Sequence, residues 1–564
     1  MVWSYAFHGS AGGGAVRGQS EQYNPFRPVR RVGIRAEIAL VDADAKTNAS
    51  ASSDLTAEPS SPGQTVDGIM RNPETFATLE RNAWVLDGNH AMMGASAQNL
   101  GWWSLGASSD DGVFPKETYI EYSFAEDAKT VGLVLHFAPG YQPAAGGMRI
   151  RTYDADGMML SDVYNDTGTP TQEIQFSSVY RRMRIDFIKT VLPGRRIRFL
   201  EIDFGVTQRF DEDTIASAEI RYKTDLASSA LPYGQCRITV DNADKRWNLL
   251  NPSGIYQYLE QGQKVSVWLV LDGEDVYMGQ WSFSSAEARD SALTAQITAV
   301  DVIAELDDAE YNGGRCAAAS LADAVAEVLG ETDIECVFDD GVGETTVMLS
   351  IPTETTKRES IRLLAQAAMA CVFAVRAGKL RFCRPVKEET KPFYLDDDGV
   401  LRYSETEDFI LGDDGVLYAP GGGIAAIFAD GVISKIDYRK SLTSNELYDY
   451  DGITVSETIG KIELVVKDEY AETEQVYIAG DSGKTKSVKN PCVASENGEA
   501  VAAWLLEKYK RSKVYNVTNR SNPATELCDT IRIEDAYAQN ETALVTGITI
   551  TYDGGIKAVT EAHG

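Results

Sequence analysis

The side chains able to do acid–base, metal or nucleophilic chemistry are scattered along this sequence. The histidines are His8, His90, His136 and His563. No two of them have metal-binding spacing, no His-Glu-x-x-His motif occurs, and neither His90 nor His136 lies beside a nucleophile elbow. We therefore expect no catalytic histidine, and His136, in a predicted strand, is interpreted as a packed or surface residue.

One short segment imitates a phosphate-binding loop. Residues 480–485 read Gly-Asp-Ser-Gly-Lys-Thr. A true loop of this kind needs a first glycine where Ile478 stands, and a helix directly after it. Residues 486–491 lack an apolar helical pattern, so a polar hairpin loop is favoured. We expect no nucleotide and no other cofactor.

The seven cysteines follow no metal-binding pattern. Their number is odd, none precedes residue 236, and no two have Cys-x-x-Cys spacing, which indicates reduced and mostly buried thiols in a protein assembled in a cytoplasm. The acidic pairs, such as Asp110-Asp111, arise by chance among 84 carboxylates and are interpreted as structural or solvent-exposed residues. We therefore expect no metal site and no catalytic residue. The cysteines are Cys236, Cys316, Cys336, Cys371, Cys383, Cys492 and Cys528.

Four aromatic residues fall in or near loops of the first β region, namely Trp84, Trp102, Trp103 and Tyr141. Aromatic faces at the end of a sandwich can stack on sugars, or they can be core residues or anchors at a protein interface. Because aromatic side chains are mostly buried, core or interface is favoured and glycan contact is the alternative.

Composition limits the class of protein. The 564 residues suggest about three to five domains. The net charge of -31 repels nucleic acid phosphates, which argues against sequence-reading DNA binding but fits the wall of a channel that DNA passes through. High solubility explains the charge equally well. Residues 1–14 carry no secretory signal, and no stretch reaches the 18 or so apolar residues of a membrane span.

The elements that must position these residues are mostly strands. Residues 1–33, rich in Gly, Ser and Arg, are expected to form a flexible arm. Residues 34–205 show short alternating strands and the hairpin signal Asp156-Gly157, which predicts a sandwich or jelly roll. Residues 206–312 form a second β region.

Helices are predicted only in the second half of the chain. Ser320 caps a helix that stops at Gly330, and Thr356 begins a capping box before a second helix. A strand pair over 371–383 follows, which makes residues 313–390 a small α/β domain.

The last third is predicted to be hairpins followed by β structure. Residues 391–433 repeat an Asp-Gly pair every 16 residues, at Asp398-Gly399, Asp414-Gly415 and Asp430-Gly431. Successive hairpins are the plain interpretation, because the ligand spacing of a calcium loop is absent. Residues 434–564 return to strands, with a helix over 496–511 capped by Ser495.

Three stretches together resemble a known family. Residues 236–256 read Cys-Arg-Ile-Thr-Val-Asp-Asn-Ala-Asp-Lys-Arg-Trp-Asn-Leu-Leu-Asn-Pro-Ser-Gly-Ile-Tyr, followed by Gly-Gln-Lys-Val at 262–265 and Tyr-Met-Gly-Gln at 277–280. This run resembles the first barrel of tail-hub proteins encoded by phages and prophages of Gram-positive bacteria.

Residues 490–555 resemble the closing barrel of the same hubs. They contain Asn490-Pro491, a helix, Asn-Pro-Ala-x-Glu-Leu-Cys-Asp at 522–529 and a final Tyr-x-Gly-Gly. Cys528 stands where glycine is usual in these hubs. Residues 34–205, through Asn-Ala-Ser-Ala-Ser-Ser at 48–53, Thr-Val-Asp-Gly at 65–68 and the closing strand, resemble a discoidin-type jelly roll.

The resemblance implies a mainly β (α+β) fold. A discoidin-like jelly-roll sandwich at 34–205 is followed by a first tube-type β barrel at 206–312. A second barrel at 434–564 follows the small α/β domain and the hairpins. Such hubs form trimers whose two related barrels give a pseudo-sixfold ring matching a sixfold tail tube.

The implied function is structural, not enzymatic. The chain is expected to be a virion protein in the baseplate or tail tip that continues the tail tube, assembled in the bacterial host cytoplasm. The implied partners are two further copies, a tail-tube or distal tail protein, a tape-measure protein and distal spike or fibre proteins. DNA would pass through the lumen without specific binding. The alternatives are a carbohydrate-binding receptor-recognition tail protein, contacting host-surface glycan, and a cell-wall glycoside hydrolase.

Overall fold

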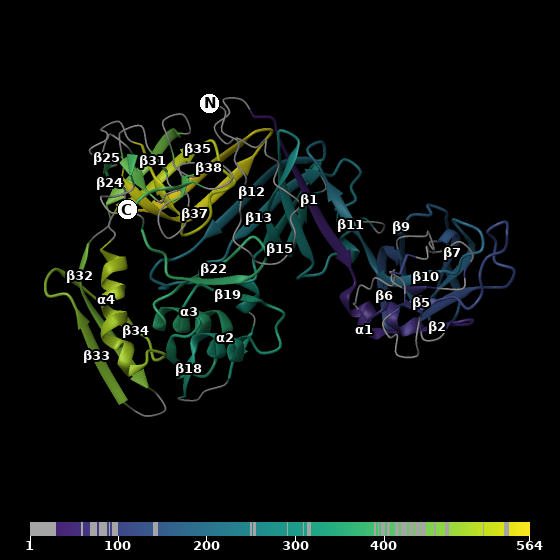
Figure 1. The fold of residues 1–564 in the computed structure, drawn as a ribbon, viewed down its shortest axis with the longest axis horizontal. Coiled ribbons are helices and arrows are strands. Elements are labelled where there is room, and N and C mark those ends of the chain that lie inside the picture. The colour runs from purple at the N-terminus through teal and green to yellow at the C-terminus, as the bar shows by residue number, and fades with distance from the viewer. Residues whose placement is uncertain are drawn as a thin grey trace. The chain divides into compact units, whose positions relative to one another are not determined.

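The computed structural model of the chain (Figure 1) describes most residues from 30 onward. The continuous parts are 30–57, 60–67, 100–138, 145–248, 255–289, 291–307, 309–312, 317–387, 458–468, 473–510, 513–534 and 541–564. Shorter described parts are 76–77, 80, 87–88, 91–92, 251, 391–392, 394–395, 401–402, 407–411, 417–418, 426–427, 432–434, 442 and 447–455. The predicted arm over 1–33 lies mostly outside them.

The chain forms two compact units. One consists of Met1–Ala36, Phe210–Lys245 and Lys264–Gly564, and the other of Glu37–Arg209 and Arg246–Gln263. We call them the main unit and the inserted unit. Both consist mainly of strands, which confirms the predicted mainly β class. No helix within the described residues is both long and apolar enough to cross a membrane.

The inserted unit is built on two long strands. Strands β6 and β9 pair antiparallel, with shifts in register after Ser123 and after Thr130. The first part of β6 also pairs with β2 and its last part with β10, so the sheet runs β5-β10-β6-β9-β7-β8 with β2 on β6. The elements are α1 (Ala43–Asn48), β2 (Ala49–Ser53), η1 (Pro62–Thr65), β3 (Phe76–Ala77), β4 (Ala91–Met92), β5 (Trp102–Trp103), β6 (Tyr119–Phe137), β7 (Ala145–Tyr153), β8 (Met159–Asn165), β9 (Thr171–Thr190), β10 (Arg198–Asp203) and η2 (Ile255–Tyr258).

Alternation along these strands produces one aromatic-rich core. Phe124 lies with its ring 5.1 Å from that of Phe204, and Phe137 stacks on Phe199 at 5.2 Å. The predicted Asp156-Gly157 turn joins β7 to β8, and Gly157 has φ 82°, a conformation that favours glycine. The hairpin prediction is therefore confirmed.

One 12-stranded sheet lies mostly in the main unit. Its order is β11-β1-β14-β15-β16-β13-β12-β37-β38-β35-β31, with β36 also on β37. The prediction of two separate barrels is wrong in this respect, because the strands of both predicted barrels join in one open path within the described residues. The strands are β1 (Val32–Val41), β11 (Gly205–Phe210), β12 (Ile215–Lys223), β13 (Gln235–Asp241), β14 (Lys264–Leu271), β15 (Glu274–Ala288), β16 (Thr294–Val300), β31 (Leu447–Val455), β35 (Lys513–Asn519), β36 (Thr530–Arg532), β37 (Thr542–Tyr552) and β38 (Ile556–His563).

The helices of the predicted α/β region begin at the capping residues that the sequence indicates. Ser320 caps α2 by accepting from the Asp323 backbone N–H, and Gly330 ends the helix with φ 60°. Thr356 caps α3 by accepting from Glu359 N–H, as the capping box predicts. The elements are η3 (Ala304–Leu306), β17 (Glu310–Tyr311), β18 (Ala318–Ser320), α2 (Leu321–Leu329), β19 (Cys336–Phe338), β20 (Thr346–Met348), β21 (Thr355–Thr356), α3 (Lys357–Ala367), β22 (Cys371–Ala374) and β23 (Leu380–Cys383).

A second group of elements packs on the same core. Strands β32 (Ile459–Asp468), β33 (Thr473–Ala479) and β34 (Lys484–Lys489) form a sheet that carries α4 (Gly498–Tyr509). Leu464 and Leu505 share one buried cluster with Leu364 of α3. The helix predicted within the second barrel thus packs with the α/β elements instead.

Ser495 does not cap α4 as predicted. It begins a short 3-10 helix, η5 (Ser495–Asn497), and the α-helix begins at Gly498. Gly498 packs directly under Tyr477, because a Cβ on Gly498 would lie 2.3 Å from the Tyr477 ring. Tyr477 Oη also donates to the Ser495 carbonyl at 3.0 Å.

Short strand pairs flank the three Asp-Gly repeats. Strand β25 (Tyr394–Leu395) pairs antiparallel with β26 (Leu401–Arg402), β27 (Ile410–Leu411) with β28 (Leu417–Tyr418), and β29 (Ala426–Ile427) with β30 (Val432–Ser434), which also pairs β24 (Lys391–Pro392). This arrangement confirms the hairpins, while the six Asp and Gly residues lie outside the described residues.

Candidate functional site

The 12-stranded sheet consists of two halves with one strand order. In chain order, the first half is β12, β13, β14, β15 and β16, and the second half is β31, β35, β36, β37 and β38. Numbered from 1 to 5 within each half, the strands lie side by side in the order 1-2-5-4-3 in both, with every pairing antiparallel. The chain has therefore built the same β topology twice.

One seam joins the two halves, and Figure 1 shows its strands β12 and β37 side by side. Ala218 to Lys223 of β12 pair antiparallel with Tyr552 to Gly547 of β37. Ile220 lies opposite Ile550, and both are buried. In each half's own numbering, strand 1 of the first half binds strand 4 of the second.

On β37 the seam uses only part of one edge. Strand β36 occupies residues 542–544 of that edge and β12 occupies 547–552, while β38 pairs along the opposite edge. The corresponding strand in the first half is β15. There β14 occupies residues 274–282 of one edge and β16 pairs on the other.

Among the described strands, two edges without a partner correspond to the two strands that form the internal seam. Among the described strands, none pairs with residues 283–288 of β15 on the side of β14. Within the part of the chain that the structure describes, strand β31, the counterpart of β12, pairs with β35 alone and ends the sheet. An unpaired strand edge presents free backbone donors and acceptors and is a template for another strand.

The end of β31 also exposes apolar side chains. Ile453 is 52% exposed and Val455 is 71% exposed. The corresponding end of β12 makes the seam, where Ile220 is only 1% exposed. Large aliphatic side chains on an unpaired strand are typical of an interaction surface, because removing their apolar area from water lowers the free energy.

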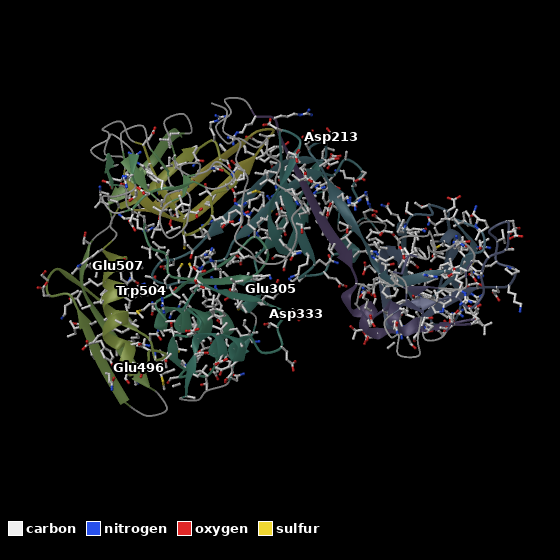
Figure 2. The ribbon with its side chains drawn as sticks, in the orientation of Figure 1. Asp213, Glu305, Asp333, Glu496, Trp504 and Glu507 are labelled. Carbon is white, nitrogen blue, oxygen red and sulfur yellow. The ribbon has the colours of Figure 1, made fainter. Side chains whose placement is uncertain are left out.

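Charged groups fasten the existing seam. Lys223 Nζ on β12 lies 3.6 Å from Glu561 Oε2 on β38, and Thr546 Oγ1 donates to Glu561 Oε1 at 3.3 Å. Interaction with His563, then with Lys223 and Thr546, lowers the pKa of Glu561 to about 2 despite partial burial. On β15, Ser282 donates to Glu305 of η3, which Figure 2 labels.

The predicted aromatic site is mostly core. Trp102 and Trp103 are 0% and 1% exposed, and Trp102 stacks on Phe187 at 5.5 Å between ring centroids. Arg198 lies 3.9 Å from the Trp103 ring centroid and pairs with Glu80. The burial of both rings favours the core interpretation over glycan contact for Trp102 and Trp103. Trp84 and Tyr141 lie outside the described residues.

The other sequence candidates are also accounted for. His136 Nε2 lies 3.0 Å from Asp203 Oδ2, so it is a packed histidine as expected. The phosphate-loop imitation joins β33 to β34, which both pair with β32, so the predicted hairpin is a crossover instead. Its glycine at 480 permits close approach, because a Cβ there would lie 2.1 Å from the Gly460 carbonyl oxygen.

Sequence reasoning missed a cluster of three cysteines. Cys371 and Cys383 are direct partners across β22 and β23. Cys528, from the loop before β36, brings its Sγ to 3.7 Å from that of Cys371. The three sulfur atoms lie within 4.8 Å of one another. The spacing of 157 residues between Cys371 and Cys528 gives no local signal, so only the fold reveals the cluster.

Comparison with known proteins yields structural neighbours alone, since no family model and no curated protein sequence matches the chain. A 43 kDa tail protein of prophage MuSo2 from Shewanella oneidensis is 14% identical, covering 63% of this chain and 93% of its own, with a TM-score of 0.38. Prophage tail protein gp18 from Listeria monocytogenes EGD-e is 8% identical, covering 63% and 91%, with a TM-score of 0.38. The family 32 carbohydrate-binding module of C. perfringens NanJ, solved with galactose, is 11% identical, covering 30% and 99%, with a TM-score of 0.20. These TM-scores are low, so the functional conclusion rests on the strands and residues of this chain.

Proposed function

We propose that this protein is a non-enzymatic structural component of a phage-type tail that assembles into a closed ring at the baseplate or tail tip. The observation that carries the proposal is the repeated 1-2-5-4-3 sheet. One seam is made within the chain, and no described strand pairs with the two edges of an equivalent seam. A ring subunit with a repeated fold needs one junction made within the chain and an equivalent junction made with the neighbouring copy.

The ring follows from repeating the internal seam between copies. Residues 450–455 of β31 in one copy pair with residues 283–288 of β15 in the next, as β12 pairs with β37 within one chain. The contact is heterologous, so it closes into a ring when the rotation per copy divides a full turn. Each copy supplies two near-equivalent walls, and three copies supply six. A trimer thereby matches the sixfold tube that the sequence resemblance implies.

The energetics of such a junction suit β-strand addition. Backbone hydrogen bonds give affinity, and alternate side chains give register. Covering Ile453 and Val455 contributes roughly 1.5–3 kcal/mol for each side chain fully buried. Hydrogen-bond directionality sets the angle between neighbours, which favours a defined ring over irregular association.

The remaining roles follow from position in a tail. The ring would continue the tail tube, contacting a tail-tube or distal tail protein and a tape-measure protein on one side, and spike or fibre proteins on the other. The net charge of -31 gives a lumen wall that does not retain DNA. Assembly takes place in the bacterial host cytoplasm before the virion is released.

The test is a site-specific photocrosslinker on the full chain. Benzoylphenylalanine in place of Val455 should crosslink one copy to a peptide containing residues 283–288 of another, and electron microscopy of the crosslinked material should show rings of three. The matched control is the same group at Val386, which is 73% exposed but lies outside both edges.

A paired substitution gives a second, independent readout. Ile453→Lys with Val455→Lys should abolish the ring and leave a folded monomer, because it places charges where apolar contact is needed. Val386→Lys should leave ring assembly intact. Crosslinks from position 455 to other segments, or rings formed unchanged by the double variant, would rule out this junction.

A further inference from the structure

The cysteine cluster lies where three separate segments meet. Cys371 begins β22, Cys383 ends β23, and Cys528 precedes β36 of the second sheet half. Cys371 and Cys383 are 0% and 4% exposed. The cluster therefore connects the α/β elements to the sheet, close to the seam between its halves, where Thr224 N–H donates to the Thr546 carbonyl at 2.9 Å.

The spacing of the sulfur atoms suits one metal ion. A zinc ion binds thiolate sulfur at about 2.3 Å, so two sulfurs of a tetrahedral site lie roughly 3.8 Å apart. Cys371 Sγ and Cys528 Sγ are 3.7 Å apart, and all three sulfurs lie within 4.8 Å of one another. The widest separation exceeds the tetrahedral spacing by at most about 1 Å, which rotation of the cysteine side chains can close.

The backbone at Cys528 gives a second, independent observation. Its φ is 66°, in the left-handed region that favours glycine and that side chains rarely adopt. The Cys528 N–H donates to the Val545 carbonyl at 2.8 Å, which fixes this conformation. The Cys528 side chain is held in a backbone conformation that favours glycine, and its thiol lies beside two buried thiols. This strain indicates a functional role for the Cys528 thiol.

A neighbouring hydroxyl group can stabilise a negatively charged sulfur at Cys371. Thr224 Oγ1 lies 2.9 Å from Cys371 Sγ and can donate to a thiolate there. The anionic form is the one that binds metals.

We propose that Cys371, Cys383 and Cys528 bind one zinc ion as three thiolates, with a small ligand such as water at the fourth position. Thr224 then donates a hydrogen bond to the Cys371 sulfur. The ion ties the β22–β23 hairpin to the loop before β36. It is therefore a structural clip that fixes the second sheet half against the α/β elements. This function is separate from ring formation through β31 and β15.

The full chain tests this directly. Protein purified without chelator from zinc-supplemented cells should contain about one zinc per chain by elemental mass spectrometry. Replacement by cobalt should give the intense sulfur-to-cobalt charge-transfer bands and the visible d–d bands of tetrahedral thiolate coordination. Removing the metal with a chelator should lower the melting temperature.

The decisive variant is Cys528→Gly. Glycine suits the positive φ, so this variant should fold, yet it should lose the zinc and become insensitive to chelator. Cys336→Ser, at a partly buried cysteine outside the cluster, is the matched control and should keep full zinc content. Zinc-free wild-type protein under supplementation, equal zinc in Cys528→Gly, or a disulfide among the three cysteines in non-reducing peptide maps would each overturn the proposal.

Discussion

Lys223 on β12 and Glu561 on β38 form an ion pair, with 3.6 Å between Nζ and Oε2, that reaches across β37. The two residues belong to different halves of the sheet, so the pair fastens the junction of two repeated folds. His563 and Thr546 complete the polar surroundings of Glu561. This group titrates in a range where its effect on the seam can be measured.

The seam should lose stability in acid through Glu561. Its pKa is lowered to about 2 from the usual 4.5, first by His563 and then by Lys223. A depressed carboxyl pKa stabilises the fold fully above its unfolded value and ceases to do so as pH falls through the folded value. The urea midpoint of the wild type should therefore drop between pH 4.5 and 2. In Glu561→Gln this drop should be shallower, and an unchanged slope would contradict the assignment.

Asp301 should produce the opposite pH dependence. Burial raises its pKa to about 7, although Gly234, Ile303 and Ala304 donate backbone N–H groups to it. The folded state then binds a proton more tightly than the unfolded state, so the stability present below the usual pKa of 3.8 is lost as pH rises through about 7. Asp301→Asn should flatten the urea-midpoint profile between about pH 4 and pH 7. Profiles that fall equally steeply in both proteins would refute this role.

Local parts of the fold could be predicted because their causes are local. Ser320 and Thr356 cap their helices through groups three residues away, and Asp156-Gly157 sets a hairpin by its own backbone conformation. The hairpins of residues 391–433 follow in the same way. The capping prediction for Ser495 was wrong because a short 3-10 helix over Ser495–Asn497 precedes α4, and the capping pattern does not distinguish the two kinds of helix.

The arrangement of strands could not be predicted, because it depends on contacts far apart in sequence. Two separate barrels were expected, yet β12 pairs with β37, which lies more than 300 residues later in the chain. One sequence signal does mark the repeat. An Asn-Pro pair stands after strand 2 of each half, at Asn251-Pro252 and at Asn522-Pro523. The cysteine cluster has no such signal.

The close approach of Gly480 to Gly460 predicts a large cost for adding one methyl group. Gly480 has φ 84°, and its Cβ would lie 2.1 Å from the Gly460 carbonyl oxygen. Gly480→Ala should therefore cost more than about 2 kcal/mol, through backbone strain and the clash together. Gly273→Ala is the control, because Gly273 has φ 93° but open space around its Cβ position, and it should cost about 1 kcal/mol. Hydrogen exchange of β32–β34 measures the difference, and equal protection in both variants would disprove it.

Trp103 should prove to be a structural residue of the inserted unit. It is 1% exposed, its Nε1 donates to the Leu100 carbonyl at 3.0 Å, and Arg198 stacks on its ring. Trp103→Ala removes a large buried ring and the face on which a buried guanidinium rests, so it should cost about 3–5 kcal/mol. Met158→Ala, at a side chain 64% exposed in the same unit, should stay within about 0.5 kcal/mol of the wild type. Thermal melts followed by near-ultraviolet circular dichroism distinguish the two. A Trp103→Ala protein that melts like the wild type but no longer binds a sugar would restore the glycan-contact interpretation.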